Sequence, residues 1–223
     1  MGFNIAIDGP AGAGKSTIAK KIAKELNFIY VDTGAMYRAM ALYMIQKNIT
    51  KENTKEIENA CENADITIQY KDGEQQVILN GENVNAYIRT EEVGKMASSV
   101  AVNKKVRLKL VDLQQRLGRQ TNVVMDGRDI GTYVLKDAQI KIYLTASSNT
   151  RAARRYAELR EKGISCDIAE IEADIIARDK QDMEREFAPL CQAEDGILID
   201  SSEMNIEQVV DAILLIYKEK KAL

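Results

Sequence analysis

Residues 4–26 read NIAIDGPAGAGKSTIAKKIAKEL, and this stretch decides the fold. It begins with a short apolar run, passes through a glycine-rich turn, and ends in a segment whose apolar residues recur with helical spacing. The turn, from Gly9 to Ser16, spells G-x-x-x-x-G-K-[ST], the pattern of a phosphate-binding loop between a strand and a helix. Because strand and helix stand on its two sides as the motif requires, we expect a nucleoside triphosphate site here.

The residue types of this loop suit a bound polyphosphate. Glycines let successive backbone N–H groups curl around phosphate oxygens, and the N-terminus of the following helix adds partial positive charge. Lys15 can reach the β- and γ-phosphates from the mouth of the loop, where we expect it to be exposed, and the Ser16 hydroxyl can bind Mg²⁺. The predicted binding loop consists of Gly9, Pro10, Ala11, Gly12, Ala13, Gly14, Lys15, Ser16 and Thr17.

Four further apolar runs resemble the strand that precedes the loop. They cover residues 28–31, 122–125, 140–144 and 197–199. Strands without polar alternation are covered on both faces, as in a parallel sheet. Five such strands separated by helical patterns predict a doubly wound α/β fold of the P-loop NTPase kind, with ligands at the carboxyl ends of the strands. We expect one domain over residues 1–223.

Residues 64–84 follow a different pattern, because apolar and polar side chains alternate on both sides of a turn at Lys71-Asp72-Gly73-Glu74. This alternation predicts a small antiparallel hairpin that projects from the core. Capping signals, or for the last helix its amphipathic pattern, predict helices in four other places. They begin at Asn53 (to about residue 63), at Asn103 (stopped by Gly118), at Asp167 (toward Arg185) and at Asn205 (to the end of the chain).

Composition excludes several classes of protein. The chain of 223 residues has a net charge of -3, so no general basic field for nucleic acid is expected. It contains no histidine, which excludes nucleophilic Ser-His and Cys-His arrangements. Its three cysteines lie far apart, and no apolar run is long enough to span a membrane, so we expect a cytoplasmic protein without membrane or nucleic-acid partners.

Arginines concentrate in one part of the chain, since ten of the twelve fall between positions 107 and 185. Their planar guanidinium groups suit phosphate oxygens, and a transfer between two phosphorylated substrates needs several positive groups. We expect the arginines of the segment from 148 to 186 to repel one another in an empty site. The pattern favours a kinase that acts on a phosphate acceptor, although Arg116, Arg119 and Arg160 are expected to be ordinary surface residues.

Two other strand ends carry residues suited to this chemistry. Asp126 follows the third core strand in a position that can hold Mg²⁺ through water, and Arg128 and Asp129 would then face the acceptor. After the second strand, Thr33 can cap the next helix and Arg38 can point at the acceptor phosphate. Neither an N-K-x-D string nor an L-S-G-G-Q string is present, which disfavours a switch GTPase and an ABC-type ATPase. A nucleotide-binding regulatory module and a kinase for UMP, AMP or another metabolite stay open as alternatives.

Taken together, these residues resemble the bacterial cytidylate kinase family over essentially the whole chain. The ordered strings that carry the resemblance are residues 7–16 (IDGPAGAGKS), 32–38 (DTGAMYR), 88–93 (IRTEEV), 126–132 (DGRDIGT), and Arg178-Asp179 leading to Ala188-Pro189-Leu190. The resemblance implies direct phosphoryl transfer from ATP to CMP and dCMP, with Mg²⁺ on the ATP. Ser16 stands where many relatives have Gly or Thr, and Thr33 where many have Ser, and both positions keep or add a hydroxyl.

The resemblance also implies roles for individual residues. Lys15, Asp126, Arg128 and Arg185 are the expected catalytic residues, with Asp126 and Ser16 near the metal ion and Arg154 on ATP. The expected substrate-binding residues are Thr33, Arg38, Ser98, Arg107, Arg128, Asp129, Arg178, Asp182 and Arg185, among which Ser98, Arg107 and Asp129 read the cytosine and Arg178 with Asp182 reaches the pentose. A CMP-binding region over 35–100, an insertion over about 63–88 and a helical lid over 148–186 complete the expected monomer.

Overall fold

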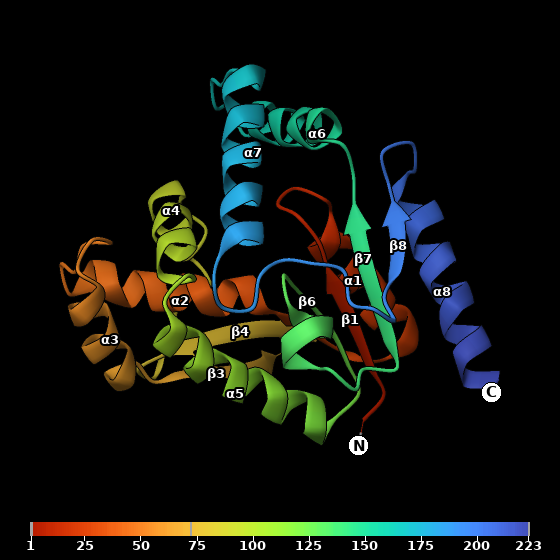
Figure 1. The fold of residues 1–223 in the computed structure, drawn as a ribbon, viewed down its shortest axis with the longest axis horizontal. Coiled ribbons are helices and arrows are strands. Elements are labelled where there is room, and N and C mark those ends of the chain that lie inside the picture. Colours follow the sequence, from red (N-terminus) through yellow and green to blue (C-terminus); the bar gives the residue numbers. More distant parts are fainter. Residues whose placement is uncertain (1, 72, 223) are drawn as a thin grey trace.

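The computed structural model describes residues 2–71 and 73–222, and its centre is a parallel sheet (Figure 1). The sheet has five strands in the order β2-β6-β1-β7-β8, and all of its pairings are parallel. The strands are β1 (Asn4–Asp8), β2 (Ile29–Asp32), β6 (Val123–Gly127), β7 (Ile140–Thr145) and β8 (Ile197–Asp200). The predicted fold class is confirmed, and each of the five expected strands lies within two residues of its predicted bounds.

Helices cover both faces of this sheet, as its apolar strands require. Ile5 and Ile7 of β1 point to one face, where they pack with α1 (Lys15–Leu26) and α8 (Ile206–Ala222). Ala6, between them, points to the other face and packs with α5 (Lys104–Gln120) and the π-helical turn η1 (Ile130–Val134). Burial on alternate faces explains why the strand sequences show no polar alternation.

A second hydrophobic core lies beside the sheet and belongs to the predicted acceptor side. Helix α2 (Thr33–Gln46) runs through it and buries Met36, Met40 and Met44 completely. Around α2 pack α3 (Thr54–Asn63), α4 (Glu91–Val100) and a small antiparallel sheet of β3 (Ile66–Lys71), β4 (Glu74–Leu79) and β5 (Glu82–Asn83). The predicted hairpin is therefore present, and it gains a short third strand. Asp72 of its turn lies outside the described residues.

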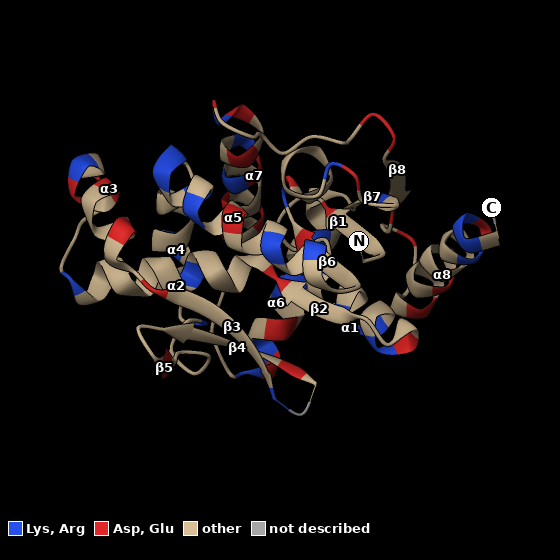
Figure 2. Cartoon of the chain, turned by 90° about the horizontal axis from the view of Figure 1, so that it is seen from below, with Lys and Arg blue, Asp and Glu red and all other residues tan. Residues whose placement is uncertain are grey.

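Two helices occupy the segment expected to form the lid. In Figure 1, α6 (Ser148–Glu161) and α7 (Ile168–Glu184) stand beyond the arrowheads of the parallel strands. Asp167 caps α7 by accepting hydrogen bonds from the N–H groups of Ala169 and Glu170, as the sequence predicted. Helix α7 carries six acidic residues together with Arg178 and Lys180, and Figure 2 shows these charges as red and blue bands. The carboxyl ends of the strands thus face two helices rich in charge.

Some predicted boundaries are wrong. Helix α5 does not stop at Gly118 but continues to Gln120. Gly118 serves close packing instead, because a Cβ atom there would lie 2.6 Å from Cδ2 of Leu135. Helix α8 ends at Ala222 within the described residues, and Leu223 lies outside them. Among residues 2–71 and 73–222, no helix has the length and apolar character that crossing a membrane requires.

Candidate active site

The predicted phosphate-binding loop joins β1 to α1 and has the backbone shape that its glycines allow. Gly14 adopts a left-handed conformation with φ +84° directly before the first residue of α1. Gly9 has φ +147°, and a Cβ atom there would collide with the carbonyl oxygen of Leu144 in β7. The motif therefore serves the fold twice, once by turning into the helix and once by letting the loop pass close to the neighbouring strand.

Lys15 lies inside the loop, so the expectation that it is exposed is wrong. Its Nζ donates to the carbonyl oxygen of Pro10 at 2.6 Å, and the residue is only 6% exposed. Burial lowers the pKa of Lys15 well below its usual value, and the nearby Arg128 lowers it further, while Asp126 opposes both. The ammonium group of Lys15 therefore lies against the loop that is predicted to bind phosphates.

The predicted magnesium site brings together two oxygen donors. The Ser16 hydroxyl donates to Oδ2 of Asp126 at 2.8 Å, and the Tyr30 hydroxyl donates to Oδ1 of the same carboxylate at 2.9 Å. Burial raises the pKa of Asp126 to about 6, and Asp32 adds to the effect while Lys15 counteracts it. Hydroxyl and carboxylate oxygens are the donors that Mg²⁺ prefers, with water completing its shell, so these residues fit the ion.

The start of α2 differs from the prediction in one respect. Asp32, not Thr33, caps the helix, because its carboxylate accepts from the N–H of Ala35 at 2.9 Å. The Thr33 hydroxyl is engaged elsewhere and donates to the carbonyl oxygen of Asp126 at 2.7 Å. Arg38, one turn along, donates to the carbonyl oxygen of Ile88 at 3.3 Å, and burial lowers its pKa.

Asp129 lies between two arginines that come from distant parts of the chain. Arg107 of α5 bonds to one carboxylate oxygen at 2.5 Å, and Arg185, which follows α7, bonds to the other at 3.1 Å. Arg107 is 1% exposed, lies over the ring of Tyr37, and its Nε has no hydrogen-bond partner among the described residues. A buried donor left unpaired is costly, so the Nε of this guanidinium is available to donate to a further partner.

A second carboxylate, Asp182 of α7, pairs with Arg128 and lies near Arg185. Arg128 donates to it from Nε at 2.7 Å, and Arg185 lies 3.6 Å from its other oxygen. Burial lowers the pKa of Arg178 to about 10, with Arg128 adding to the shift, and the Nε of Arg178 has no partner in the described part of the chain. Within segment 148–186, Arg151 and Arg185 are paired with carboxylates of α7 and of the β6–η1 turn, so the expected repulsion is offset at these two residues. Arg178 still shows it, because Arg128 adds to the effect of burial in lowering its pKa.

The remaining predicted residues lie at the edges of this site. Ser98 of α4 is half-buried, and its carbonyl oxygen accepts from Gln181 of α7 at 2.9 Å. Arg154 of α6 donates to the carbonyl oxygen of Ser201, after β8, at 2.7 Å. Arg116 is a surface residue paired with Asp112, as expected. The structure therefore brings Arg107, Arg128, Asp129, Asp182 and Arg185 together, and we refer to these five as the acceptor cluster.

Several buried polar residues near the site were not predicted as site residues. Asp8, the last residue of β1, accepts from the N–H groups of Ile130 at 2.8 Å and Gly131 at 2.7 Å. Burial raises the pKa of Asp8 to about 7, against the opposing effect of these two hydrogen bonds. Arg151 and Asp179 form a buried pair beside the loop. A charged residue in an otherwise apolar strand was the available signal for Asp8. Asp179 belongs to one of the strings that carry the family resemblance, but no pattern in the sequence connects it with Arg151.

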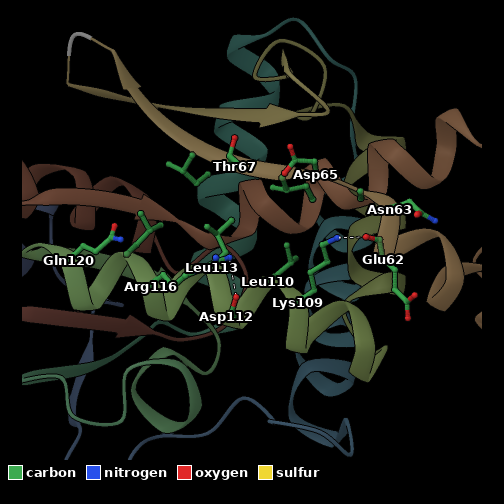
Figure 3. Close-up of a pocket in the computed structure, with 14 residues that line it drawn as sticks. Glu62, Asn63, Asp65, Thr67, Lys109, Leu110, Asp112, Leu113, Arg116 and Gln120 are labelled. Carbon is green, nitrogen blue, oxygen red and sulfur yellow. Dashed lines mark hydrogen bonds and ion pairs between the residues drawn. The ribbon is translucent and has the colours of Figure 1, made fainter.

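A separate cavity of about 690 Å³ lies between α5 and the strand β3 (Figure 3). In Figure 3, Leu110 and Leu113 of α5 line one side of it, and Asp65 and Thr67 line the other. Lys109 donates to the carbonyl oxygens of Cys61 at 2.7 Å and Glu62 at 2.9 Å. None of the residues lining the cavity is a predicted site residue, so it is distinct from the loop and the acceptor cluster.

Comparison with known proteins gives a consistent result. The family model described as Cytidylate kinase matches residues 5–219. A cytidylate kinase of Caldicellulosiruptor saccharolyticus is 52% identical over 97% of this chain and 96% of its own length. A cytidylate kinase of Alkaliphilus oremlandii is 50% identical over 96% of this chain and 97% of its own. Among solved structures, an uncharacterized protein from Eubacterium ventriosum shares the fold with a TM-score of 0.55 at 14% identity, covering 98% of this chain and 99% of its own.

Proposed function

Because the chain belongs to the cytidylate kinase family, we propose that it transfers the γ-phosphoryl group of ATP directly to the phosphate of CMP or dCMP. The observation that carries the proposal is that the predicted ATP site and the predicted acceptor site begin at neighbouring strands. Strands β1 and β6 are neighbours in the sheet, and their carboxyl ends lead into the phosphate-binding loop and into the turn with Arg128 and Asp129. A donor site and an acceptor site therefore open at the same edge.

The residue roles follow from charge and position. Lys15 leaves Pro10 for the transferring phosphate, where it stabilises the charge of the transition state. Arg38, Arg128 and Arg185 bind the acceptor phosphate and the group in transfer, and Arg154 contacts ATP. The acceptor oxygen is already an anion near neutral pH, so no general base is needed, which suits a chain without histidine.

Ser16 and Asp126 are the residues that would hold Mg²⁺, Ser16 directly and Asp126 through water. When bound, the ion would supply positive charge that offsets the negative charge developing on the phosphate oxygens. The hydroxyl of Tyr30 keeps the Asp126 carboxylate in one orientation. Asp126 must be ionised for this role, and Lys15 favours the ionised form by lowering the carboxyl pKa against the effect of burial.

The acceptor base is read by Ser98, Arg107 and Asp129. Cytosine offers an N4 amine donor and an N3 acceptor, which match a carboxylate and a guanidinium, whereas uracil presents the opposite pattern at these positions. Both arginine partners of Asp129 leave it free lone pairs for an amine. Arg178 and Asp182 contact the pentose from α7. When the substrate binds, these two side chains would exchange their present contacts for contacts with the pentose.

An assay of ADP formation with a panel of nucleoside monophosphates tests the proposal. We expect CMP and dCMP to support turnover at least about 100-fold better than UMP in kcat/KM, because two mismatched polar pairs would face uracil. Efficient turnover of UMP or AMP instead would show that the proposed acceptor, CMP or dCMP, is wrong. ATP binding without any acceptor turnover would favour a regulatory module in which the arginines dock a protein partner.

The lid is tested separately. Segment 148–186 is expected to close over ATP and acceptor and to keep water from the transferring group. Hydrogen exchange across α6 and α7 should slow when a bisubstrate analogue is added, and unchanged exchange would remove the lid from the proposal. We also propose that the enzyme works as a monomer, and sedimentation tests this. Three free cysteines favour a reducing compartment such as the cytoplasm.

A further inference from the structure

One buried ion pair near the loop has no part in the mechanism described so far. Arg151, at the start of α6, is 6% exposed, and Asp179, in the fourth turn of α7, is 7% exposed. Their side chains meet at 2.6 Å. Burying two charges is costly unless both find further hydrogen-bond partners, so the partners of this pair indicate what it does.

Both members of the pair bond to the backbone of one residue in the phosphate-binding loop, Ala11. The N–H of Ala11 donates to Oδ1 of Asp179 at 3.1 Å, and the carbonyl oxygen of Ala11 accepts from Nη1 of Arg151 at 2.8 Å. Arg151 also donates from Nε to the carbonyl oxygen of Ala146, just after β7, at 2.9 Å. The pair therefore fixes the loop to the lid helices and to the end of the central sheet.

Packing at the next residue supports this link. Gly12 has φ +77°, and a Cβ atom there would lie 3.4 Å from Cβ of Arg151 and 3.8 Å from Cδ1 of Ile175 in α7. The tip of the loop thus rests directly on both lid helices. A loop with this many glycines has many accessible conformations, and fixing it by itself would cost considerable entropy.

We propose that Asp179 and Arg151 are positioning residues that hold the phosphate-binding loop in its binding shape by clamping the Ala11 peptide. The proposal rests on the ATP site assigned above. It implies that the two lid helices support ATP binding before any acceptor is present. The Arg151–Asp179 pair already orders the loop, so ATP binding does not have to supply the entropy cost of ordering it. Ala11 then serves the site through this clamp, since its N–H is taken by Asp179.

The test measures binding of Mg-ATP by calorimetry, without acceptor, together with thermal unfolding. We expect Asp179→Asn and Arg151→Met each to weaken ATP binding at least about tenfold, since hydrogen bonds to charged groups are the strong ones. Arg160→Met on α6 and Asp174→Asn on α7 are matched controls, because both residues are exposed. These controls should bind ATP as the wild type does.

A double variant separates positioning from stability. Arg151→Met with Asp179→Leu replaces the pair by apolar side chains, which often restores the stability that a single change removes. If the pair positions the loop, the double variant regains the melting temperature but not the affinity for ATP. If affinity returns together with stability, or if Asp179→Asn stays within about threefold of the wild type, the pair is merely structural and the proposal is wrong.

The wild-type enzyme supplies a test that needs no variant to fold. The Ala11 amide should exchange slowly with solvent in the ATP-free enzyme, because Asp179 accepts its hydrogen bond. Exchange of that amide as fast as in an unprotected loop would overturn the clamp. A wild-type enzyme that fails to bind Mg-ATP at all would instead overturn the assigned ATP site, so the two failures are distinguishable.

Discussion

The phosphate-binding loop and the acceptor cluster lie at the same edge of the sheet but are held together in different ways. The loop is a continuous stretch, residues 9–16, shaped by the backbone freedom of its glycines. The acceptor cluster joins residues of α5, the β6–η1 turn and the end of α7 through buried pairs between arginine and aspartate. The difference teaches that a site made by local backbone geometry can be recognised from one string, whereas a site made by long-range ion pairs depends on the whole fold.

On the side of the phosphate-binding loop, removal of the single charge of Lys15 should be enough to abolish most of the activity. Lys15→Ala is expected to lower kcat at least about 100-fold, because one group that stabilises charge in the transition state is typically worth that much. Lys15→Met should lose as much activity while it keeps the packing of the buried stem. Steady-state kinetics at saturating substrates, with a thermal melt of each variant, is the measurement.

Lys24→Ala, an exposed lysine on the same helix, is the control and should keep full turnover. A Lys15→Ala enzyme that keeps more than about a tenth of wild-type turnover would show that the lysine does not act on the transferring group.

Asp8 joins the two regions, and its titration should be visible in stability. The carboxyl pKa is raised to about 7 in the folded protein from 3.8 without the fold's influence, chiefly by burial. Between these values the folded state holds a proton that the unfolded state has lost, so the free energy of unfolding falls as pH rises and levels off above pH 7. We expect this group to contribute a decrease of about 2 kcal/mol between pH 5 and pH 7.

Asp8→Asn cannot titrate, so the difference in unfolding free energy between wild type and variant isolates this contribution. Urea unfolding at several pH values measures it. If the difference does not change with pH, the two hydrogen bonds from Ile130 and Gly131 outweigh burial and keep Asp8 ionised throughout.

On the acceptor side, one substitution should change the choice of base. Asp129→Asn offers an amide whose N–H can meet O4 of uracil, so the ratio of kcat/KM for CMP over UMP should fall at least about tenfold. The KM for ATP should change little, because the ion-pair partners of Asp129 are Arg107 and Arg185 of the acceptor cluster. Both acceptors are measured at saturating ATP.

The buried arginines give this experiment an internal check. Asp129→Asn leaves Arg107 and Arg185 without their shared carboxylate, so the melting temperature should fall even where activity survives. Asp137→Asn, at an exposed position, controls for the substitution itself. An unchanged ratio would move the reading of the base from Asp129 to Ser98 and Arg107.

The extent to which the sequence predicts this molecule follows the same division. The parallel strands and the loop were predictable, because each depends on neighbouring residues and on burial of both faces of the sheet. The hydrogen-bond and ion-pair partners of Asp8, Arg107 and Asp179 were not predictable. These partners lie far away in the sequence, and they meet only after the strands have paired, as Ile7 of β1 does with Asp126 of β6. Strand β5 also escaped prediction, because a strand of two residues has no periodicity to detect.

The smallest expected effect concerns the insertion, and it tests how far the acceptor side depends on distant support. The Gln75 carboxamide pairs with the backbone of Asp32 like a neighbouring strand, accepting from its N–H at 2.8 Å and donating to its carbonyl oxygen at 3.2 Å. Asp32 caps α2, which carries Arg38, so Gln75→Ala should raise the KM for CMP about threefold, the cost of about one ordinary hydrogen bond. The KM for ATP should not change, because the side chain of Gln75 bonds to Asp32 of the acceptor side. Gln76→Ala, at the next position of the same strand, is the matched control, and an equal effect of both changes would mean that the insertion acts only through its general stability.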